Sequence, residues 1–372
     1  MNLKSSSGGV IATGLTLFTL VAASGLMMGQ AHGQSQPVDS QSSAEQEIGQ
    51  ELETYASFDA NTPPGNIAIG PDGRKFLSVH GFYGQAVKMV ELFNDGSVKP
   101  YPTAAWASSP DENQIGLYNV LGVDVDKNGV LWMLDTSDEE HAGRLVGWNT
   151  RTESLEQIIY IAKPMIRASS FLNDLAIDNK NGKIYLADTA GNGQAAIVVV
   201  DIKTGQTRRV LEGRVITLSG KPVRLGVNPI TIAPDSKWLY FGSMSGTSIY
   251  RVLTDDITDN TLDMAALEDN IERYGDKSLS DGMTIDGAGN MYVTSVTQGA
   301  IEVTDSSGDS RTLYKDQRIV WPDGFANGTD GYIYFTVNEL HRSPVLNGGV
   351  NASKGEFKVM RFPVLAEGKA DR

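Results

Sequence analysis

The sequence contains no cysteine among its 372 residues, only four histidines and no lysine- or arginine-rich run. The missing thiols exclude disulfide bridges, thiolate metal sites and cysteine nucleophiles. Its 31 lysines and arginines face 45 aspartates and glutamates, so the formal net charge is -14 and the chain would repel nucleic acids and anionic membrane surfaces. Any chemistry must therefore come from oxygen groups and imidazoles, and we expect neither nucleic acid nor membrane as a partner.

The first 50 residues have the composition of an export signal followed by a linker. Residues 1–33 contain one lysine, an apolar stretch from Val10 to Met28, and Ala31-His32-Gly33 just before Gln34. This pattern is typical of a cleaved secretory signal peptide, and the alternative is a permanent membrane anchor. Residues 34–50 are polar and predict a flexible leader. We therefore expect a secreted or periplasmic protein whose single folded domain spans residues 51–372.

The remainder of the chain repeats one pattern six times. Each copy has a polar or turn-forming start, a short apolar stretch, a polar turn and a second apolar strand, which together are typical of a β-hairpin. A third strand follows most copies and a fourth follows several. The copies are GNIAIGPDGRKFL from Gly65, LGVDVDKNGVLWM from Leu121, NDLAIDNKNGKIYL from Asn173, NPITIAPDSKWLY from Asn228, DGMTIDGAGNMYV from Asp281 and DGFANGTDGYIYFT from Asp323. This repetition predicts an all-β fold, a six-bladed β-propeller, with a pair of β-sandwiches as the alternative.

The sixth copy lacks its outermost strand. After residues 332–337 the chain has one more strand-like stretch, 357–364, whereas residues 53–59 precede the first copy without a hairpin partner. We predict that this N-terminal strand pairs with 357–364, completes the last blade and removes an exposed sheet edge. Residues 261–275 are predicted to form a helix inserted on one rim.

The residues just before the first strand of each copy are the main site candidates. In a propeller these first strands surround the central channel, so the six positions converge on one mouth. Two asparagines and two aspartates there would form an oxygen-rich cluster suited to a hard cation or to polar ligand groups. The alternative is that each side chain only caps its own turn. The six positions hold Gly65, Leu121, Asn173, Asn228, Asp281 and Asp323.

The other polar candidates are weaker. His80, His141 and His341 lack the spacing of a helical zinc site, and His341 is the candidate catalytic residue because its loop, residues 338–356, is long and would border the channel. Several further aspartates are assigned to hairpin turns away from the mouth. They are Asp174, Asp178, Asp235 and Asp286.

With these residues in view, the chain resembles the major royal jelly protein and Yellow family. The stretches that carry the resemblance are VKPYPTAAW (98–106), GVDVDKNGVLWMLDTS (122–137), SFLNDLAIDNKNGKIYLADTAGNG (170–193), PITIAPDSKWLYFGSMSGTSIYRV (229–252), SDGMTIDGAGNMYVTSVTQGAI (280–301) and WPDGFA (321–326). The resemblance implies a six-bladed propeller. It also implies dopachrome conversion, as in insect members, or binding of biogenic amines inside the channel, as in salivary members.

A more distant resemblance is to the senescence-marker and gluconolactonase propellers, and it implies a divalent metal at the channel mouth. In that family a Glu, two Asn and an Asp hold the metal. Asn173 and Asp281 match two of these ligands, and calcium would be the cofactor. Gly65 stands where the Glu should be and Leu121 where the other Asn should be, with Asn119 two residues away.

Together these features predict an exported, monomeric propeller that binds a small polar or aromatic molecule at its central mouth. Asn173, Asn228, Asp281 and Asp323 are the predicted ligand-binding residues. The resemblance adds isomerase-type chemistry as an expectation. Two alternatives are a metal-dependent lactonase and a non-catalytic scaffold for a ligand or a protein partner.

Overall fold

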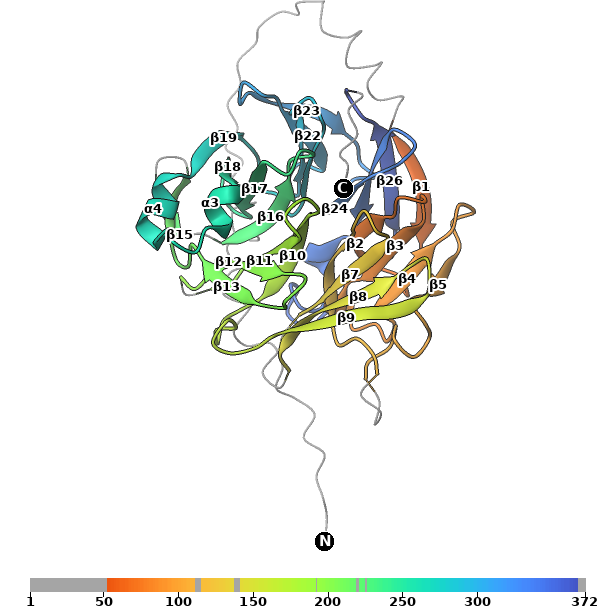
Figure 1. Ribbon diagram of the computed structural model, residues 1–372. Helices are drawn as coiled ribbons and strands as arrows, with labels where there is room; N and C mark the ends of the chain where they lie inside the picture. Colours follow the sequence, from red (N-terminus) through yellow and green to blue (C-terminus); the bar gives the residue numbers. More distant parts are fainter. Residues whose placement is uncertain are drawn as a thin grey trace, which may run out of the picture.

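The computed structural model describes residues 52–110, 115–136, 141–191, 193–218, 221–224 and 226–366. Six four-stranded antiparallel sheets form a ring around a central axis, which is the channel of a propeller (Figure 1). The six-bladed β-propeller predicted from the repeats is therefore confirmed. The predicted signal peptide and leader lie outside the described residues. No helix in the described part of the chain has the length and apolarity needed to cross a membrane.

Each blade is built from four strands in sequence order, from the channel outward. The first three blades consist of β2 (Pro64–Ile69), β3 (Lys75–Val79), β4 (Met89–Leu92), β5 (Val98–Pro100); β6 (Val120–Val125), β7 (Val130–Asp135), β8 (Gly143–Asn149), β9 (Ser154–Ile161); and β10 (Leu172–Asp178), β11 (Lys183–Asp188), β12 (Ala196–Asp201), β13 (Thr207–Val210).

The last three blades follow the same order, except that the outer strand of the sixth comes from the N-terminal end of the domain. They consist of β16 (Val227–Ile232), β17 (Trp238–Ser243), β18 (Ser248–Leu253), β19 (Glu272–Asp276); β20 (Met283–Ile285), β21 (Met291–Ser295), β22 (Ala300–Thr304), β23 (Ser310–Lys315); and β24 (Pro322–Asn327), β25 (Tyr332–Val337), β26 (Phe357–Pro363), β1 (Glu53–Phe58).

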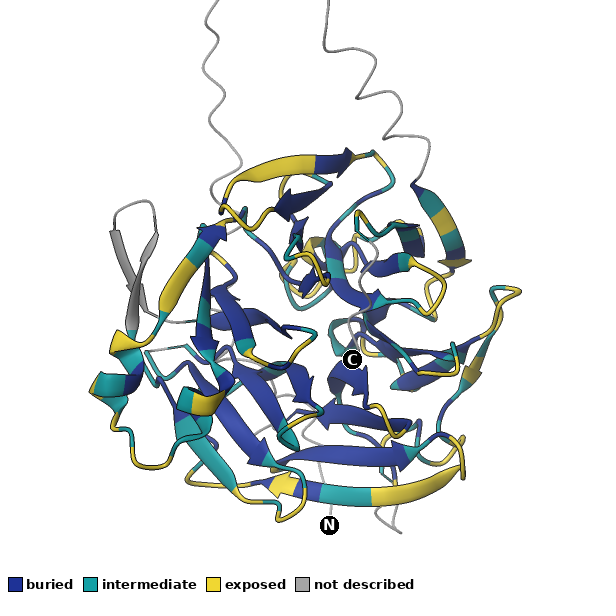
Figure 2. Ribbon diagram, turned by 45° about the horizontal axis from the view of Figure 1, so that its top comes forward, coloured by how far each residue is buried: buried dark blue, intermediate teal, exposed yellow. Residues whose placement is uncertain are grey.

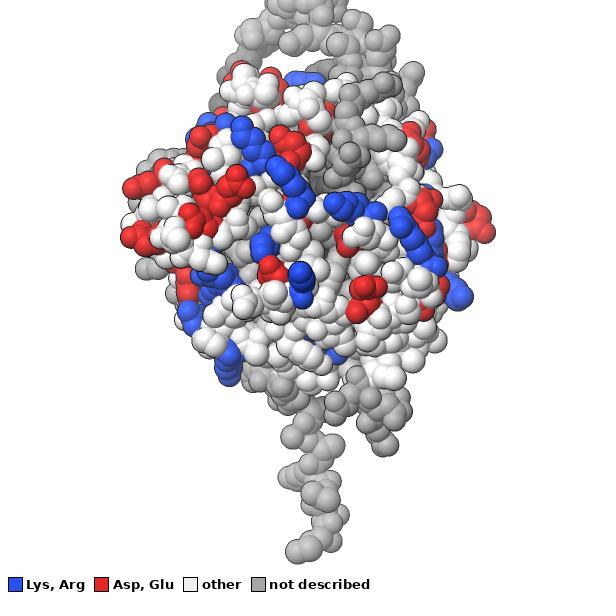
Figure 3. Space-filling model, in the orientation of Figure 1, with Lys and Arg blue, Asp and Glu red and all other residues white. Residues whose placement is uncertain are grey.

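The short elements lie in the connections between strands. The hairpin β14 (Val215–Leu218) and β15 (Lys221–Arg224) links blades three and four, and the 3-10 turns η2 (Gly81–Tyr83) and η3 (Leu340–Arg342) follow β3 and β25. Helices α3 (Thr254–Thr258) and α4 (Met264–Asp269) precede β19. The predicted helix 261–275 is thus only six residues long, because residues 272–276 pair with β18 as the outer strand of blade four. Acidic side chains gather over α3 and α4 (Figure 3).

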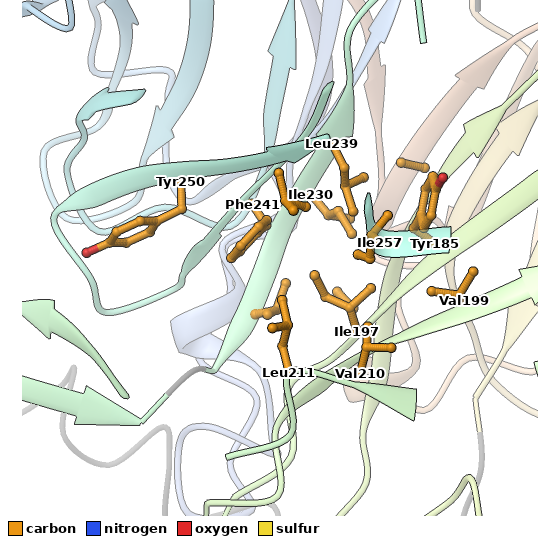
Figure 4. Packing of buried hydrophobic residues seen from close by; sticks show 14 of the residues in the cluster. Tyr185, Ile197, Val199, Val210, Leu211, Ile230, Leu239, Phe241, Tyr250 and Ile257 are labelled. Atoms are coloured by element: carbon orange, nitrogen blue, oxygen red, sulfur yellow. The ribbon is translucent and has the colours of Figure 1, made fainter. Parts of the chain in front are cut away.

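The blades are held together by apolar side chains from facing sheets. Between blades three and four, Ile230 and Phe241 pack in one buried cluster with Ile197 (Figure 4). Inner strands are buried along nearly their whole length, whereas outer strands such as β9 are mostly exposed or half-buried, with only Ile159 and Ile161 of β9 buried (Figure 2). Full burial of each large apolar side chain contributes about 1.5–3 kcal/mol, so the inter-blade layers carry most of the stability.

The ring closes as the sequence predicts. β1 pairs antiparallel with β26, from Glu53 opposite Arg361 to Phe58 opposite Phe357. A 2.8 Å ion pair between Arg361 and Glu53 supports the register. The first and last described strands therefore share one blade, and the edge that β26 would otherwise expose is covered.

The inner strands carry a β-bulge at the same place in the repeat. In five of the six described blades, the register between the first and second strands shifts immediately before the central apolar residue. The shifts lie between Pro64/Ile67, Val120/Val123, Leu172/Asp174, Val227/Ile230 and Pro322/Phe325. Because a bulge sets two consecutive residues against one partner, both can direct their side chains to the channel.

Hydroxyl groups at the end of the second strands join neighbouring blades at these bulges. The Ser78 hydroxyl donates to the Leu121 carbonyl at 2.8 Å, and the Thr336 hydroxyl donates to the Gly65 carbonyl at 2.6 Å. Each bond links the second strand of one blade to the inner strand of the next. The end of the channel that holds the predicted residues is therefore fixed by side-chain bonds as well as by packing.

Candidate functional site

Three of the four predicted mouth residues are joined by hydrogen bonds. Asn173 Nδ2 donates to Asn228 Oδ1 at 2.6 Å, and Asn228 Nδ2 donates to Asp281 Oδ1. The second carboxylate oxygen of Asp281 accepts a 2.8 Å bond from the indole N–H of Trp321. This chain of bonds crosses the inner ends of blades three to six, because the same repeat position in successive blades lies on one ring.

Asp323, the fourth predicted residue, accepts a 2.7 Å bond from Asn338 Nδ2. Burial raises the pKa of Asp323 well above its usual range, and the negative charges of Asp281 and Asp174 raise it further. Burial also raises the pKa of Asp281, but bonds from Trp321 and Asn228 oppose that rise. Of the two carboxyl groups, Asp281 receives more N–H donors and Asp323 retains a proton more readily.

Asp174 lies in the channel, so its assignment to a hairpin turn was wrong. Its Oδ1 accepts a 2.9 Å bond from Nδ2 of Asn66. Asn66 belongs to blade one and Asp174 to blade three, so this bond spans the channel side of blade two. The bulge explains the error: a regular strand would direct Asp174 away from the face that Asn173 occupies, whereas the bulge brings both side chains to the channel. By contrast, Asp178 and Asp286 cap hairpin turns, as predicted.

Glycines allow the neighbouring inner strands to approach each other closely. A Cβ atom on Gly324 would lie 2.0 Å from Asn66 Oδ1, and one on Gly282 would lie 2.1 Å from the Asp323 carbonyl oxygen. Only a residue without a side chain fits these positions. These glycines therefore draw the polar side chains of blades one, five and six together.

A buried lysine lies beside the cluster. Lys277 Nζ donates to the carbonyls of Gly246 at 2.7 Å and Ser278 at 3.1 Å. Burial lowers the pKa of Lys277 to about 7, although the charges of Glu302 and Asp281 raise it. Its ammonium group is thus held by backbone carbonyls, and part of the negative charge of Asp281 is balanced from within the protein.

Aromatic side chains border the mouth on the side of blades one and three. The rings of Phe82, in η2, and Phe171, just before β10, lie 6.1 Å apart. His80 packs edge-on against Phe82 at 4.7 Å, and its Nδ1 accepts a bond from the Phe82 backbone N–H. Burial lowers the pKa of His80 to about 3, so this imidazole is neutral at physiological pH. The mouth thus combines apolar rings with buried carboxyl groups.

The other two histidines also lie after second strands. His141 stacks on Tyr118 with ring centroids 3.8 Å apart. His341, the predicted catalytic candidate, is exposed in η3 and stacks on Trp321 at 5.6 Å. The face of its ring that stacks on Trp321 is shielded from water, and this partial desolvation together with the charge of Arg342 lowers the pKa of His341. His341 stacks on the face of the Trp321 ring, while the indole N–H at the edge of that ring donates to Asp281. Trp321 therefore separates His341 from the hydrogen-bonded row of Asn173, Asn228 and Asp281.

Comparison with known families identifies the chain. A model of the major royal jelly protein family matches residues 118–369. The chain belongs to the major royal jelly protein family. The resemblance inferred from its sequence motifs is thereby confirmed, and the match covers blades two to five and three of the four strands of blade six of this family member. No curated protein sequence matches the chain.

Solved structures confirm the propeller fold. A gluconolactonase from Xanthomonas campestris superposes with a TM-score of 0.56 at 14% identity, covering 84% of this chain and 89% of that one. A calcium-binding protein, regucalcin, from Agrobacterium tumefaciens has a TM-score of 0.55 at 15% identity, covering 85% and 96%. Virginiamycin B lyase from Staphylococcus aureus has a TM-score of 0.53 at 15% identity, covering 84% and 99%. At these identities the likeness is one of fold.

Proposed function

We propose that the chain is exported and that the mouth of its channel binds a small organic molecule that carries a protonated amine and an aromatic ring. The observation that carries the proposal is the enclosed group of three carboxyl side chains, Asp174, Asp281 and Asp323, in which the charges of the first two raise the pKa of the third. A bound cation would relieve this repulsion and would favour ionisation of Asp323. The proposal requires no nucleic acid, membrane or second subunit.

The aromatic part of the ligand has a matching surface. Phe82 and Phe171 form an apolar pair beside the mouth, and His80 is neutral. Aromatic faces attract both rings and cations, by roughly 0.5–2 kcal/mol each. Carboxylates at the floor and rings at the side are the usual complement of an aromatic amine.

Binding of tyramine, measured by isothermal titration calorimetry, tests the proposal. At a pH above the pKa of Asp323, we expect Asp323→Asn to weaken tyramine binding about tenfold, because it removes the negative charge of the ionised carboxyl group while preserving the acceptor for Asn338. In the wild-type protein the affinity should rise as pH increases through the pKa of Asp323, which is above its usual range, because the carboxyl group ionises while the amine keeps its proton up to about pH 10.

The matched control is Asp235→Asn, since Asp235 accepts a bond from the Lys237 backbone N–H in a hairpin turn at the other end of blade four. It should bind tyramine like the wild type. Absence of wild-type binding at any pH, or equal binding by Asp323→Asn and the wild type, would refute the amine site.

We further propose that the bound ligand is isomerised at the mouth by proton transfer. Asp281, as carboxylate, would accept a proton from one atom of the ligand, and Asp323, as carboxylic acid, would return a proton to another, which is the arrangement that tautomerisation requires. His341 lies on the far face of Trp321 and would act only at the rim. Dopachrome decay that is faster with the wild type than with Asp281→Ala would support turnover, and equal rates would leave a binding protein.

The second candidate function is a metal-dependent lactonase, which the gluconolactonase-like neighbours favour by fold. The donor set around Asp281 does not fit calcium, which takes six to eight oxygen ligands. Gly65 and Leu121 carry no side-chain oxygen, both oxygens of Asp281 accept N–H bonds, and Asn173 bonds Asn228. Among the described residues, no group of three or more His, Asp or Glu side chains is arranged to hold a metal ion.

We therefore expect calcium and chelator to have little effect. The melting temperature measured by differential scanning fluorimetry should agree within about 1 °C in about 2 mM EDTA and in about 2 mM CaCl₂. If calcium did bind the native state, a concentration about tenfold above its Kd would raise the free energy of unfolding by about 1.4 kcal/mol and would raise the melting temperature. A calcium-induced rise of several degrees that Asp281→Ala abolishes would support the lactonase instead.

A further inference from the structure

A pocket lies on the rim between blades five and six, apart from the channel mouth. It has a volume of about 430 Å³. Its walls come from the turn between β21 and β22, the connection from β23 to β24, and η3. The apolar part of the lining consists of Val296, Ile319, Val320 and Trp321, and His341 stacks on the indole.

Trp321 forms the wall between this pocket and the mouth. It is the residue before β24 and has a left-handed backbone conformation, with φ of 57°. A non-glycine residue in this region costs about 1–2 kcal/mol, and such strain is often found at functional sites. The conformation is held by the indole bond to Asp281 and by the backbone bond from Asn338 to the Trp321 carbonyl. The indole N–H of Trp321 thus donates to Asp281 at the mouth, while the side chain lines the rim pocket.

The charge of the rim pocket is opposite to that of the mouth. Lys315 lines the pocket, and no carboxylate among the described residues lies within ion-pair distance of it. Asp316, which also lines the pocket, is neutralised by a 2.7 Å ion pair with Arg318. The neighbouring His341 ring is neutral at physiological pH, since its pKa is lowered. Gln298, Gln317 and Thr297 complete the polar lining.

We propose that this rim pocket is a separate binding site for a planar aromatic carboxylate. The ring of the ligand would lie against the His341 and Trp321 side of the pocket, with Val296 and Ile319 covering it. The carboxylate would pair with Lys315 and accept bonds from the amides of Gln298 or Gln317. This site is distinct from the amine site of the proposed function, because the two differ in charge and lie on opposite sides of Trp321.

Two probes of similar shape and opposite charge test the inference. 4-Hydroxyphenylacetate and tyramine share a phenol ring and differ in carrying a carboxylate or an ammonium group. In calorimetric titrations of the full exported chain, we expect 4-hydroxyphenylacetate to bind once per chain. Lys315→Gln should weaken that binding at least tenfold and leave tyramine binding unchanged. The control Lys127→Gln, an exposed lysine in the turn between β6 and β7 at the other end of the propeller, should change neither.

A competition experiment shows whether 4-hydroxyphenylacetate binds in the rim pocket or at the channel mouth, which lie on opposite sides of Trp321. Saturating tyramine should leave the affinity for 4-hydroxyphenylacetate within about twofold, because the sites are separate. Displacement of the acid by tyramine, failure of the acid to bind at millimolar concentration, or unchanged binding by Lys315→Gln would each overturn the inference. Failure of tyramine alone to bind would refute the amine site and leave the rim site standing.

Discussion

Deleting residues 34–59 from the exported chain is expected to abolish the stable fold. The deletion removes β1, whose Phe58 and Ala56 are buried in the core cluster of the closing blade. It also removes Leu52, which is buried against blades five and six, and leaves the edge of β26 unpaired. Loss of one buried Phe costs about 3–5 kcal/mol, and a domain has only about 5–15 kcal/mol in total.

Urea or thermal unfolding followed by circular dichroism measures this effect. We expect the midpoint of unfolding to fall so far that the variant is largely unfolded or aggregated at 37 °C, since unpaired edges associate. Deletion of residues 34–50 alone is the control and should leave the midpoint unchanged, because the sequence predicts a polar leader there. Equal midpoints for the two deletions would show that β1 does not hold the ring closed.

Replacement of Asp281 by alanine is expected to have the largest effect on ligand binding. The carboxylate accepts bonds from Asn228 and Trp321, so its loss leaves two buried donors unpaired and removes the best-stabilised negative charge of the mouth. An unpaired buried donor costs about 1–3 kcal/mol. We expect tyramine affinity to fall at least a hundredfold and the free energy of unfolding to fall by about 2–4 kcal/mol.

Binding and stability separate the role of Asp281 from that of its neighbours. Asp235→Ala removes an aspartate from a turn of blade four, away from the mouth, and should retain full tyramine binding. If Asp281→Ala binds tyramine like the wild type and unfolds at the same denaturant concentration, Asp281 only shapes its turn and the site lies elsewhere. Lower stability with unchanged affinity would give it a structural role alone.

Much of the fold follows from local patterns in the sequence. A hairpin depends on alternating apolar residues and a turn, and both are visible within about 13 residues of each repeat. Six phased copies imply a ring, and the missing strand of the sixth copy identifies β1 as its partner. The same phase brings Asn173, Asn228 and Asp281 into one chain of bonds. Local patterns fail where a segment can form either a helix or a strand. Residues 272–276 continue a helical pattern in the sequence, yet they form β19 because β18 offers an unpaired edge.

Only the tertiary structure determined which further side chains reach the channel. Asp174 follows Asn173 directly and would face away from it in a regular strand; the bulge, stabilised by contacts between blades, turns it toward Asn66, 108 residues away in the chain. From the sequence alone, Trp321 is expected to be an ordinary apolar core residue. Its bond to Asp281 depends on a left-handed backbone conformation that no local motif specifies. Lys277 is buried against Gly242, where a Cβ atom would lie 2.7 Å from its Cε atom, and its Nζ is held by the carbonyls of Gly246 and Ser278. The positions of equivalent residues in the six repeats can be read from the sequence, because each repeat is a local pattern. Bulges, backbone strain and the burial of charged groups arise from contacts between residues that are distant in the chain.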